Sequence, residues 1–373
     1  MKTIRDFNLR GKRVLVRCDF NVPLSPKGEV LDDFRIRKTI PTIKYLIEKG
    51  AKIILMSHLG RPEGREEKYS LKPVALRLGK LLRKPVKFLP DCVGPEVEKE
   101  IEKMKEKDIV LLENLRFHKE EEGNDENFAK KLSKLGDIFI NEAFGASHRA
   151  HASIVGIPKF LISGTGLLLE KEIKILKNLL QNPQKPLVAI VGGKKVEDKV
   201  KAIDKISKSA LFILVNGLIQ REIKEKNIFF KFPQKLVEPV DEIEGKDIGP
   251  MTISLFKQKI ALAKTIFWNG PLGQIEKEEF QNGTKEIAKA IIESGAFLVI
   301  GGGETVEFIN QCKLASKFNH VSTGGGAMLE FLAGEKLPGI EVLKYGNKKF
   351  RKSRYKNKKS NQKWRKHLAL RRC

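Results

Sequence analysis

Polar and cationic side chains follow four apolar runs in the first half of the chain. They are Arg17, Asp19, Asn21, His58, Arg61, Arg116, His118, His148, Arg149 and His151. Any one of them could be a solvent-exposed arginine or a hydrogen-bonded histidine, but recurrence after four successive runs indicates a shared site. A planar guanidinium group binds phosphate or carboxylate through two hydrogen bonds. The pattern predicts a site for a small ligand with several negative charges. It favours that anion over a metal cation, because the group lacks paired carboxylates.

Glycine-rich turns follow the apolar runs of the second half. Their sequences are GGKKVEDK (192–199), NGPLG (269–273), GGGET (301–305) and GGGAM (324–328). Backbone N–H groups in such turns, at helix N-termini, bind phosphate groups. The chain contains neither the P-loop sequence GxxxxGK[ST] nor the dinucleotide-binding sequence GxGxxG, so neither of those classes is supported. The two halves together predict phosphoryl transfer between an acidic small molecule and a polyphosphate.

The elements that must position these groups are expected to be buried parallel strands. Continuous apolar runs occupy 13–20, 51–60, 108–115, 137–144, 186–193, 210–217, 265–270 and 296–303, and most are followed by a turn and a helical pattern. Such runs are typical of parallel sheets that helices cover on both faces. Because ligands bind beyond the carboxyl ends of parallel strands, the polar groups and the glycine turns should each converge at one sheet edge.

A long amphipathic pattern lies between the two sets of strands. Leu169, Ile173, Leu176 and Leu180 recur at helical spacing, and prolines follow at 183 and 186. This pattern predicts a helix that connects two lobes. A chain of 373 residues is also long enough for two domains.

Composition limits the class of protein. Hydrophobic residues make up 41% of the chain, which excludes wholesale disorder and a collagen-like fibre. The four cysteines, Cys18, Cys92, Cys312 and Cys373, are far apart and form no Cys/His cluster in the sequence, so reduced thiols are expected rather than structural zinc. The N-terminus lacks a signal-type apolar region and no apolar run is long enough for a membrane span. We therefore expect a soluble cytoplasmic protein.

Several longer motifs resemble the signature segments of the phosphoglycerate kinase family. In order, they are RCDFNVP, DDFRIRKTIPTI, SHLGRP, SLKPVA, LLENLRFH, HRAHAS, VGGKKVEDK, DIGPMTISLF, WNGPLG, GGGET and STGGGAMLEFLAG. The resemblance implies an α/β fold of two Rossmann-like lobes joined by a helix, in a monomeric, hinge-bending kinase. The implied reaction is magnesium-dependent and reversible: 1,3-bisphosphoglycerate and ADP give 3-phosphoglycerate and ATP.

The resemblance also implies domain boundaries. It divides the chain into an N-terminal lobe for 3-phosphoglycerate (1–165), an inter-domain helix (166–185), a C-terminal nucleotide-binding lobe (186–335), a segment that returns to the N-terminal lobe (336–345) and a basic tail (346–373).

Site residues follow from the same motifs. The implied substrate-binding residues are Asp19, Asn21, Arg35, His58, Arg61, Arg116 and Arg149. The implied nucleotide-binding residues are Gly193, Lys195, Lys199, Asn269, Glu276, Gly302, Gly303 and Thr305, with Glu276 on the ribose hydroxyls. The implied catalytic residues are Arg35, Lys195, Gly302 and Gly325, and the implied magnesium ligand is Glu304. Arg35 would stabilise the charge on the phosphoryl group during transfer.

Three departures from the family pattern affect these expectations. Glu304 replaces the family's aspartate and is one methylene longer, so magnesium affinity is expected to change. After 210–217 the chain reads GLIQREIKEKN and lacks residues that normally line the adenine, which puts base selectivity in doubt. Lys194 replaces an alanine and could contact phosphate or face solvent.

The basic tail supports a competing hypothesis. The net charge is +26, and residues 344–373 hold fourteen Lys and Arg but no Asp or Glu. Phe350, Tyr355 and Trp364 alternate with these cations, a composition suited to phosphate contacts and base stacking. The alternative function is a catalytically weak kinase scaffold that binds RNA or another polyanion through the tail. Two further readings are a functionally neutral tail and a kinase for a different acyl phosphate.

Overall fold

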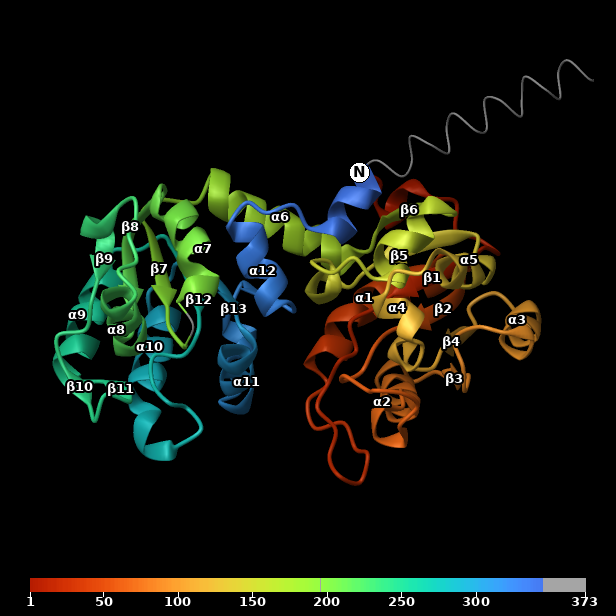
Figure 1. The fold of residues 1–373 in the computed structure, drawn as a ribbon, viewed down its shortest axis with the longest axis horizontal. Coiled ribbons are helices and arrows are strands. Elements are labelled where there is room, and N and C mark those ends of the chain that lie inside the picture. Colours follow the sequence, from red (N-terminus) through yellow and green to blue (C-terminus); the bar gives the residue numbers. More distant parts are fainter. Residues whose placement is uncertain (195, 345–373) are drawn as a thin grey trace, which may run out of the picture. The chain divides into compact units, whose positions relative to one another are not determined.

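The computed structural model describes residues 1–194 and 196–344, which form two compact units (Figure 1). The first unit contains Met1–Glu170 and the described residues from Pro338 onward, and the second contains Lys171–Leu337. Each unit is built on its own six-stranded sheet. Lys195 and the tail residues 345–373 lie outside the described residues.

The sheet of the first unit is parallel throughout, with strand order β3-β4-β2-β1-β5-β6. Its strands are β1 (Arg13–Arg17), β2 (Lys52–Met56), β3 (Lys87–Phe88), β4 (Ile109–Leu111), β5 (Ile138–Asn141) and β6 (Ile162–Thr165). The central strands are buried along almost their whole length, because helices cover both faces of the sheet. The sequence prediction of buried parallel strands is confirmed here.

Helices of the first unit pack their apolar faces on this sheet. They are α1 (Phe34–Glu48), α2 (Lys72–Leu82), α3 (Pro95–Glu102), α4 (Lys119–Glu122) and α5 (Glu126–Lys134). Ile36 and Ile43 of α1 and Val74 and Leu78 of α2 are fully buried in one core with β1 and β2. The described chain ends in a helical stretch, 338–344, that belongs to this unit.

The second unit repeats this architecture with strand order β14-β13-β12-β7-β8-β9, again parallel. Its strands are β7 (Leu187–Val191), β8 (Ala210–Val215), β9 (Leu236–Val237), β12 (Thr265–Asn269), β13 (Phe297–Gly301) and β14 (His320–Val321). A small antiparallel pair is formed by β10 (Glu242–Ile243) and β11 (Asp247–Ile248). The helices are α7 (Glu197–Ser207), α8 (Gly217–Glu225), α9 (Pro250–Ile260), α10 (Asn282–Glu293), α11 (Gly303–Gln311) and α12 (Gly325–Leu332).

A single helix, α6 (Leu167–Gln181), contains the boundary between the units, at Glu170/Lys171. Its start is capped by the buried side chain of Glu142, which accepts hydrogen bonds from the backbone N–H groups of Leu168 (3.1 Å) and Leu169 (3.3 Å). Among the described residues, none of the helices combines the length and apolarity that crossing a membrane requires.

Candidate active site

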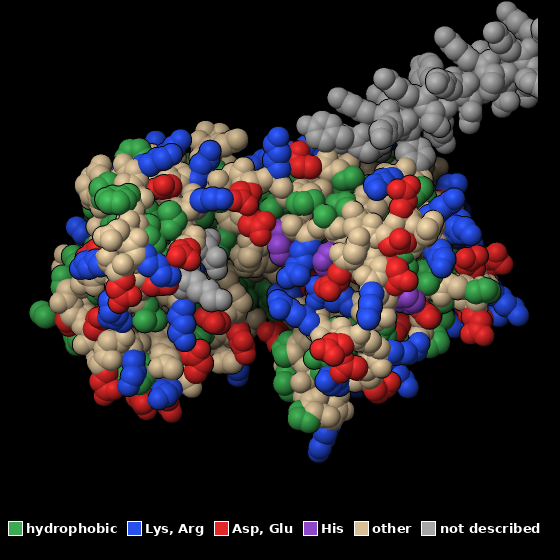
Figure 2. Space-filling model, in the orientation of Figure 1, with side chains coloured by type: hydrophobic (Ala, Val, Ile, Leu, Met, Phe, Trp, Pro, Cys, Tyr) green, Lys and Arg blue, Asp and Glu red, His purple; other side chains and the backbone are tan. Residues whose placement is uncertain are grey.

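The cationic group of the first unit lies at the ends of four neighbouring strands, β4, β2, β1 and β5. The register aligns Arg17 of β1 with Met56 of β2 and with Asn141 of β5. The loops that follow these strands therefore start at about the same level of the sheet. On the face shown in Figure 2, Lys and Arg side chains gather beside histidines on this unit.

Arg17 is the buried centre of this group. Its side chain is fully buried, and Nε donates to Ser153 Oγ at 2.7 Å. Nη2 lies 3.2 Å from His58 Nδ1 and 3.7 Å from Glu121 Oε1. A buried guanidinium requires a compensating charge, and the fully buried carboxylate of Glu121 supplies it.

Glu121 is a member of this site that the sequence patterns do not reveal. It accepts hydrogen bonds from the backbone N–H (2.9 Å) and hydroxyl (2.5 Å) of Ser153 and lies 3.8 Å from His151 Nδ1. It sits within an acidic run, KEEE, that reads as a solvent-exposed helix end. Its role follows only from its tertiary contacts with β1 and with the 147–153 segment.

Two buried histidines of the group, His58 and His151, have lowered pKa values. Burial, with the nearby Arg17, Arg116 and Arg35, holds the pKa of His58 well below its ordinary value. Burial and the neighbouring arginines likewise lower the pKa of His151 to about 3. The arginines therefore carry the positive charge, and the histidines offer hydrogen bonds.

Arg35 extends from the first turn of α1 to the loop after β1. Its Nη1 donates to Asp19 Oδ1 and to the carbonyl oxygen of Asn21, both at 3.1 Å. Its side chain is 31% exposed, whereas that of Asp19 is 8% exposed. The guanidinium is thus held at the surface of the site, with donors left for a ligand.

Arg116 and Asn21 together fix the turn at Gly60. Arg116 Nη1 donates to the Gly60 carbonyl at 2.5 Å, and the Gly60 N–H donates to Asn21 Oδ1 at 2.9 Å. Gly60 has φ +62°, and a Cβ there would lie 2.3 Å from the Tyr69 ring, so the turn requires glycine. Arg61 follows this turn and is exposed.

Arg149 lies close to the same group, and His118 does not bond to it. Arg149 Nε donates to His148 Nε2 at 3.3 Å, and burial, together with the charge of Arg149, lowers the pKa of Arg116. His118 instead places Nε2 2.8 Å from Asp91 Oδ1 and stacks on Phe128. The structure thus brings together Arg17, Arg35, His58, Arg116, Arg149 and His151, with Asp19 and Asn21 at their edge.

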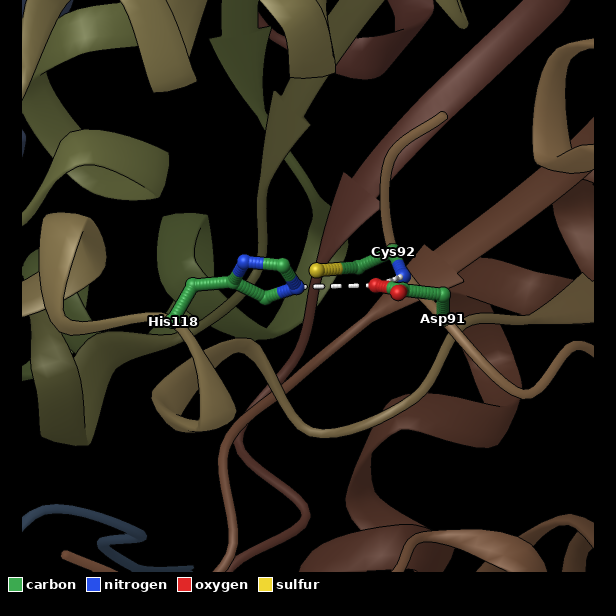
Figure 3. Close-up of side chains that lie close together, drawn as sticks. All are labelled: Asp91, Cys92 and His118. Atoms are coloured by element: carbon green, nitrogen blue, oxygen red, sulfur yellow. Dashed lines mark hydrogen bonds and ion pairs between the residues drawn. The ribbon is translucent and has the colours of Figure 1, made fainter. Parts of the chain in front are cut away.

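Cys92 joins His118 and Asp91 in a separate cluster (Figure 3). One ligand atom from each of the three residues lies within 4.8 Å of the other two. The expectation of reduced cysteines agrees with Cys92 being a free thiol, and this spatial cluster is one that the spacing of cysteines in the sequence does not reveal. The partner of Cys92, His118, lies 26 residues further along the chain, and only folding of the sheet brings the two loops together.

The glycine turns of the second unit also follow four neighbouring strands, β14, β13, β12 and β7. Asn269, the last residue of β12, is in register with Val191 of β7 and Gly301 of β13. Gly270 has φ +91°, and a Cβ there would lie 2.1 Å from the Gly192 carbonyl oxygen. The turns after β12 and β7 are in direct backbone contact, which glycine alone permits.

Lys199 is anchored beneath the turn after β7. Its Nζ donates to the carbonyl oxygens of Gly192 (2.8 Å) and Lys194 (2.6 Å), and the residue is 8% exposed. A Cβ at Gly193 would lie 3.2 Å from this ammonium group. The side chain of Lys194 is exposed, as the solvent-facing alternative requires. Lys195 belongs to the undescribed positions.

The turns after β12, β13 and β14 meet around Asn269 and Gly302. Asn269 Nδ2 is buried and has no hydrogen-bond partner among the described residues, so a donor is available to a ligand. Thr305 Oγ1 accepts from the Gly270 N–H at 2.9 Å. A Cβ at Gly325 would lie 3.1 Å from Gly302 Cα. The N-termini of α11 and α12 therefore lie side by side, an arrangement that favours an anion.

Two acidic residues lie near these turns. Glu304 is exposed in the first turn of α11, and Glu276 is exposed in the loop after β12. Proteins usually hold Mg²⁺ through one or two carboxylates together with substrate phosphates and water. One exposed carboxylate beside glycine turns and helix N-termini that suit phosphate fits that pattern, so the residues present suit Mg²⁺.

Comparisons with known proteins agree over nearly the whole chain. The family model for phosphoglycerate kinase matches residues 4–229 and 219–335. Phosphoglycerate kinase from Dictyoglomus turgidum is 47% identical, covering 91% of this chain and 97% of the relative, and that from Aquifex aeolicus is 44% identical, covering 92% and 98%.

Solved structures of phosphoglycerate kinases also match this chain. The crystal structure of phosphoglycerate kinase from Pyrococcus horikoshii matches with a TM-score of 0.84 at 32% identity and covers 94% of this chain and 100% of that one. The structure of phosphoglycerate kinase from Coxiella burnetii matches with a TM-score of 0.76 at 33% identity, covering 92% and 98%.

The sequence predicts that the segment after 210–217 is shorter than in the family, and these matches are consistent with that prediction. The alignment with the Dictyoglomus protein spans 386 positions, more than the 373 residues of this chain, so the relative contains residues that this chain lacks. The two matched ranges overlap over 219–229, within and just after α8. This is the region that follows β8, where the sequence departs from the family pattern.

Proposed function

The chain belongs to the phosphoglycerate kinase family and catalyses that family's reaction, and on this premise we propose which of its residues perform each part. The reaction is reversible phosphoryl transfer between 1,3-bisphosphoglycerate and ADP, giving 3-phosphoglycerate and ATP. The comparisons give no support to the alternative, a weak kinase scaffold that binds a polyanion. The tail on which that alternative rests, 346–373, lies outside the described residues.

The arginine group of the first unit is proposed to bind 3-phosphoglycerate and the bisphosphate. The observation that carries this proposal is the convergence of Arg17, Arg116 and Arg149, from the ends of β1, β4 and β5, with Arg35 of α1 around His58 and His151. A ligand with a carboxylate and a phosphate offers several acceptors to these donors. Asp19, Asn21, His58 and Arg61 are proposed to complete the site. Neutral His58 and His151 add hydrogen bonds without adding charge.

The glycine turns of the second unit are proposed to bind the nucleotide. The support is the set of close backbone contacts at Gly193, Gly270, Gly302 and Gly325 and the unpartnered Asn269 Nδ2. Gly303 and Thr305 open α11, whose N–H groups favour phosphate. Lys195 and Lys199 are proposed to contact phosphates and Glu276 the ribose hydroxyls.

The chemistry requires little covalent participation by the protein. A β-phosphate oxygen of ADP attacks the phosphorus of the acyl phosphate, and the bond from that phosphorus to the carboxyl oxygen breaks. Catalysis then depends on alignment and on stabilising charge on the transferred group. Arg35 is proposed to donate to that group, and the helix N-termini at Gly302 and Gly325 are proposed to stabilise its negative charge.

Mg²⁺ is proposed as the accompanying cation. Glu304 would hold it together with nucleotide phosphates, and when bound the ion neutralises phosphate charge. A monomeric state and a cytoplasmic location are also proposed, and both rest on the family alone.

A coupled assay of ATP formation tests these roles. Purified protein with magnesium and 1,3-bisphosphoglycerate should form ATP from ADP, and a parallel reaction with GDP measures how far the shortened segment after β8 has relaxed base selectivity. Arg35→Ala should lower kcat about 10²–10³-fold, the loss typical of removing one donor to a developing charge. Arg10→Ala, at an exposed arginine on the same unit, is the control. Unchanged kcat in the folded Arg35→Ala variant would remove Arg35 from the proposed mechanism.

A further inference from the structure

The cluster of Asp91, Cys92 and His118 lies outside the arginine group and has no part in the phosphoryl transfer. Asp91 and Cys92 belong to the loop between β3 and α3, and His118 lies between the 3-10 turn Leu115–Phe117 and α4. All three residues belong to the first unit. Figure 3 shows the imidazole Nε2, the thiol sulfur and the carboxylate directed toward one point from two separate segments.

We propose that these three side chains form a binding site for a zinc-class divalent cation. Nitrogen, sulfur and oxygen donors in one place are the set that Zn²⁺ and Co²⁺ prefer, whereas Mg²⁺ prefers oxygen ligands alone. Three protein ligands leave the fourth tetrahedral position to water. On binding, the Cys92 S–H bond breaks, a metal–sulfur bond forms and the proton passes to solvent.

The geometry of the cluster suits such a site with small side-chain movements. The three donor atoms lie within 4.8 Å of one another, and in a tetrahedral zinc site donors are separated by about 3.5 Å, given metal–ligand bonds of about 2.0–2.3 Å. The 2.8 Å hydrogen bond between His118 Nε2 and Asp91 Oδ1 would be replaced by two bonds to the cation.

The cluster is accessible from solvent, and neighbouring contacts hold two of its side chains in place. The side chains of His118 and Asp91 are 27% and 40% exposed, while Cys92 is buried behind them. A cation can therefore enter from solvent and reach the thiol. The Cys92 N–H donates to Asp91 Oδ1 at 2.6 Å, and the His118 ring stacks on Phe128 with centroids 5.1 Å apart. These contacts already orient two of the three ligands.

A bound cation would strengthen the connection between two loops that the hydrogen bond between His118 and Asp91 already links. His118 lies two residues after Arg116, whose guanidinium holds the Gly60 turn. The site would therefore stabilise the loop that carries Arg116. This proposal does not rest on the assignment of the reaction, because none of the three ligands is proposed to touch its substrates.

Cobalt titration of the full-length protein tests the site directly. Reduced, metal-free protein is titrated with Co²⁺ in the presence of excess Mg²⁺. We expect one equivalent to produce a thiolate-to-cobalt charge-transfer band and the visible bands of tetrahedral cobalt, and stoichiometric Zn²⁺ to remove them. Absence of these bands at millimolar Co²⁺ would overturn the proposal.

Variants assign the signal to this cluster. Cys92→Ser should abolish the charge-transfer band, and His118→Asn and Asp91→Asn should each weaken Co²⁺ binding at least tenfold. Cys312→Ser and Cys373→Ser, at two of the three cysteines outside the cluster, should leave the spectrum intact. If Cys92→Ser does not fold, the His118 and Asp91 variants still decide the matter. Unchanged Co²⁺ affinity in both of these variants, or loss of the band in Cys312→Ser or Cys373→Ser, places the metal elsewhere and refutes the site.

Thermal unfolding provides a measurement of metal binding that does not depend on the absorption spectrum. A ligand that binds only the folded state raises Tm in proportion to the logarithm of its concentration. Zn²⁺ at concentrations well above its Kd should raise the Tm of the wild-type protein by a few degrees and raise that of the His118→Asn variant clearly less. An equal rise in both proteins would contradict the proposal.

Discussion

At the scale of single residues, the site of the first unit depends on charges that are buried in pairs. Arg17 and Glu121 are both fully buried, with Nη2 and Oε1 3.7 Å apart. Breaking such a pair leaves the remaining charge without compensation and costs roughly 3–5 kcal/mol. Arg17 also lies 3.2 Å from His58 Nδ1, so the pair influences the orientation of a proposed ligand-binding group.

Replacing Glu121 with glutamine tests this pairing. Glu121→Gln keeps the shape of the side chain but removes its charge, so Arg17 should lose its fixed position. We expect Tm to fall by on the order of 10 °C, given roughly 2–4 °C per kcal/mol for units of this size, and KM for 3-phosphoglycerate to rise more than kcat falls. Differential scanning calorimetry and steady-state kinetics measure the two effects. Glu120→Gln, one residue away and exposed, should match wild type in both; equal behaviour of the two variants would show that the pair contributes nothing.

Residue-level features were only partly predictable from the sequence. Arg17, Arg116 and Arg149 lie at or after the ends of apolar runs, so the topology rule for parallel sheets was enough to group them, whereas Arg35, in the first turn of α1, was expected only from the family resemblance. Glu121 and Asp91 were not predictable, because their partners lie far away in the sequence and their local patterns read as solvent-exposed. Neutral histidines were also missed, because the pKa of His58 depends on burial that the sequence does not reveal.

At the scale of elements, contacts between turns position the second unit's site. Gly325 opens α12, and a Cβ there would meet Gly302 Cα at 3.1 Å and the Gly303 nitrogen at 3.3 Å. Both neighbours are backbone atoms that cannot rotate away. The two helix N-termini can approach this closely only because neither turn carries a side chain at the contact.

Gly325→Ala should therefore separate the turns. We expect KM for ADP to rise about tenfold and Tm to fall, since forcing an extra carbon into a packed region costs roughly 1–3 kcal/mol. Thermal unfolding with and without ADP measures both stability and nucleotide binding. Gly326→Ala provides the stability control, because a Cβ there meets nothing within 4 Å. A Gly325→Ala variant with wild-type Tm and wild-type ADP response would argue against the close contact.

The start of α6 contains a titrating group. Glu142 is fully buried and accepts hydrogen bonds from the Thr42 hydroxyl and from two backbone N–H groups of α6. Burial raises the pKa of Glu142 to about 8, from 4.5. Between these values the folded state binds more protons than the unfolded state, so the free energy of unfolding decreases as pH rises through this range and levels off above it.

Glu142→Gln should reduce this dependence on pH. One pKa unit corresponds to about 1.4 kcal/mol, so the wild-type protein should lose several degrees of Tm between pH 6 and pH 8.5 through this group. Glutamine does not titrate and keeps an acceptor for the helix N–H groups, so the variant should lose less. Melting curves across that range are the measurement, with Glu48→Gln at the exposed end of α1 as the control. Parallel curves for all three proteins would show that Glu142 does not titrate there.

The elements themselves differed in how well the sequence predicted them. Continuous runs of Val, Ile and Leu correctly indicated the central strands, and helical spacing indicated α6. The strands β9, β10 and β11 have two residues each, and their formation depends on pairing with neighbours rather than on local propensity. No pattern in 236–248 distinguishes them from a loop.

At the scale of the whole molecule, the charge of +26 has two parts. One part is organised by the fold, since the arginines of the first unit meet at a single sheet edge. The other is concentrated after residue 343, in a segment largely outside the described residues. Attraction of anionic substrates depends on charge near the site, because salt screens charges beyond about 8–10 Å.

Deleting residues 346–373 should therefore leave catalysis intact. We expect kcat, KM for 3-phosphoglycerate and the salt dependence of that KM to remain within about twofold of wild type, because the organised charge of the first unit accounts for steering. Kinetics at low and high KCl provide the measurement. A large increase in KM at low salt, in a deletion variant with normal Tm, would show that the tail takes part in substrate capture.

The first unit is formed by two parts of the chain that are separated by the whole second unit, and this affects the order in which the units can fold during translation. Asn141 Nδ2 donates to the Gly339 carbonyl at 3.3 Å, and the Gly339 N–H donates to the Ser147 carbonyl at 2.9 Å. The segment that begins at Pro338 is synthesised after the whole of the second unit, Lys171–Leu337. During translation, the second unit can fold while the first, although begun earlier, still lacks a part of itself. The ribosome therefore begins the first unit before the second, but the second unit is the first to have its whole chain available for folding.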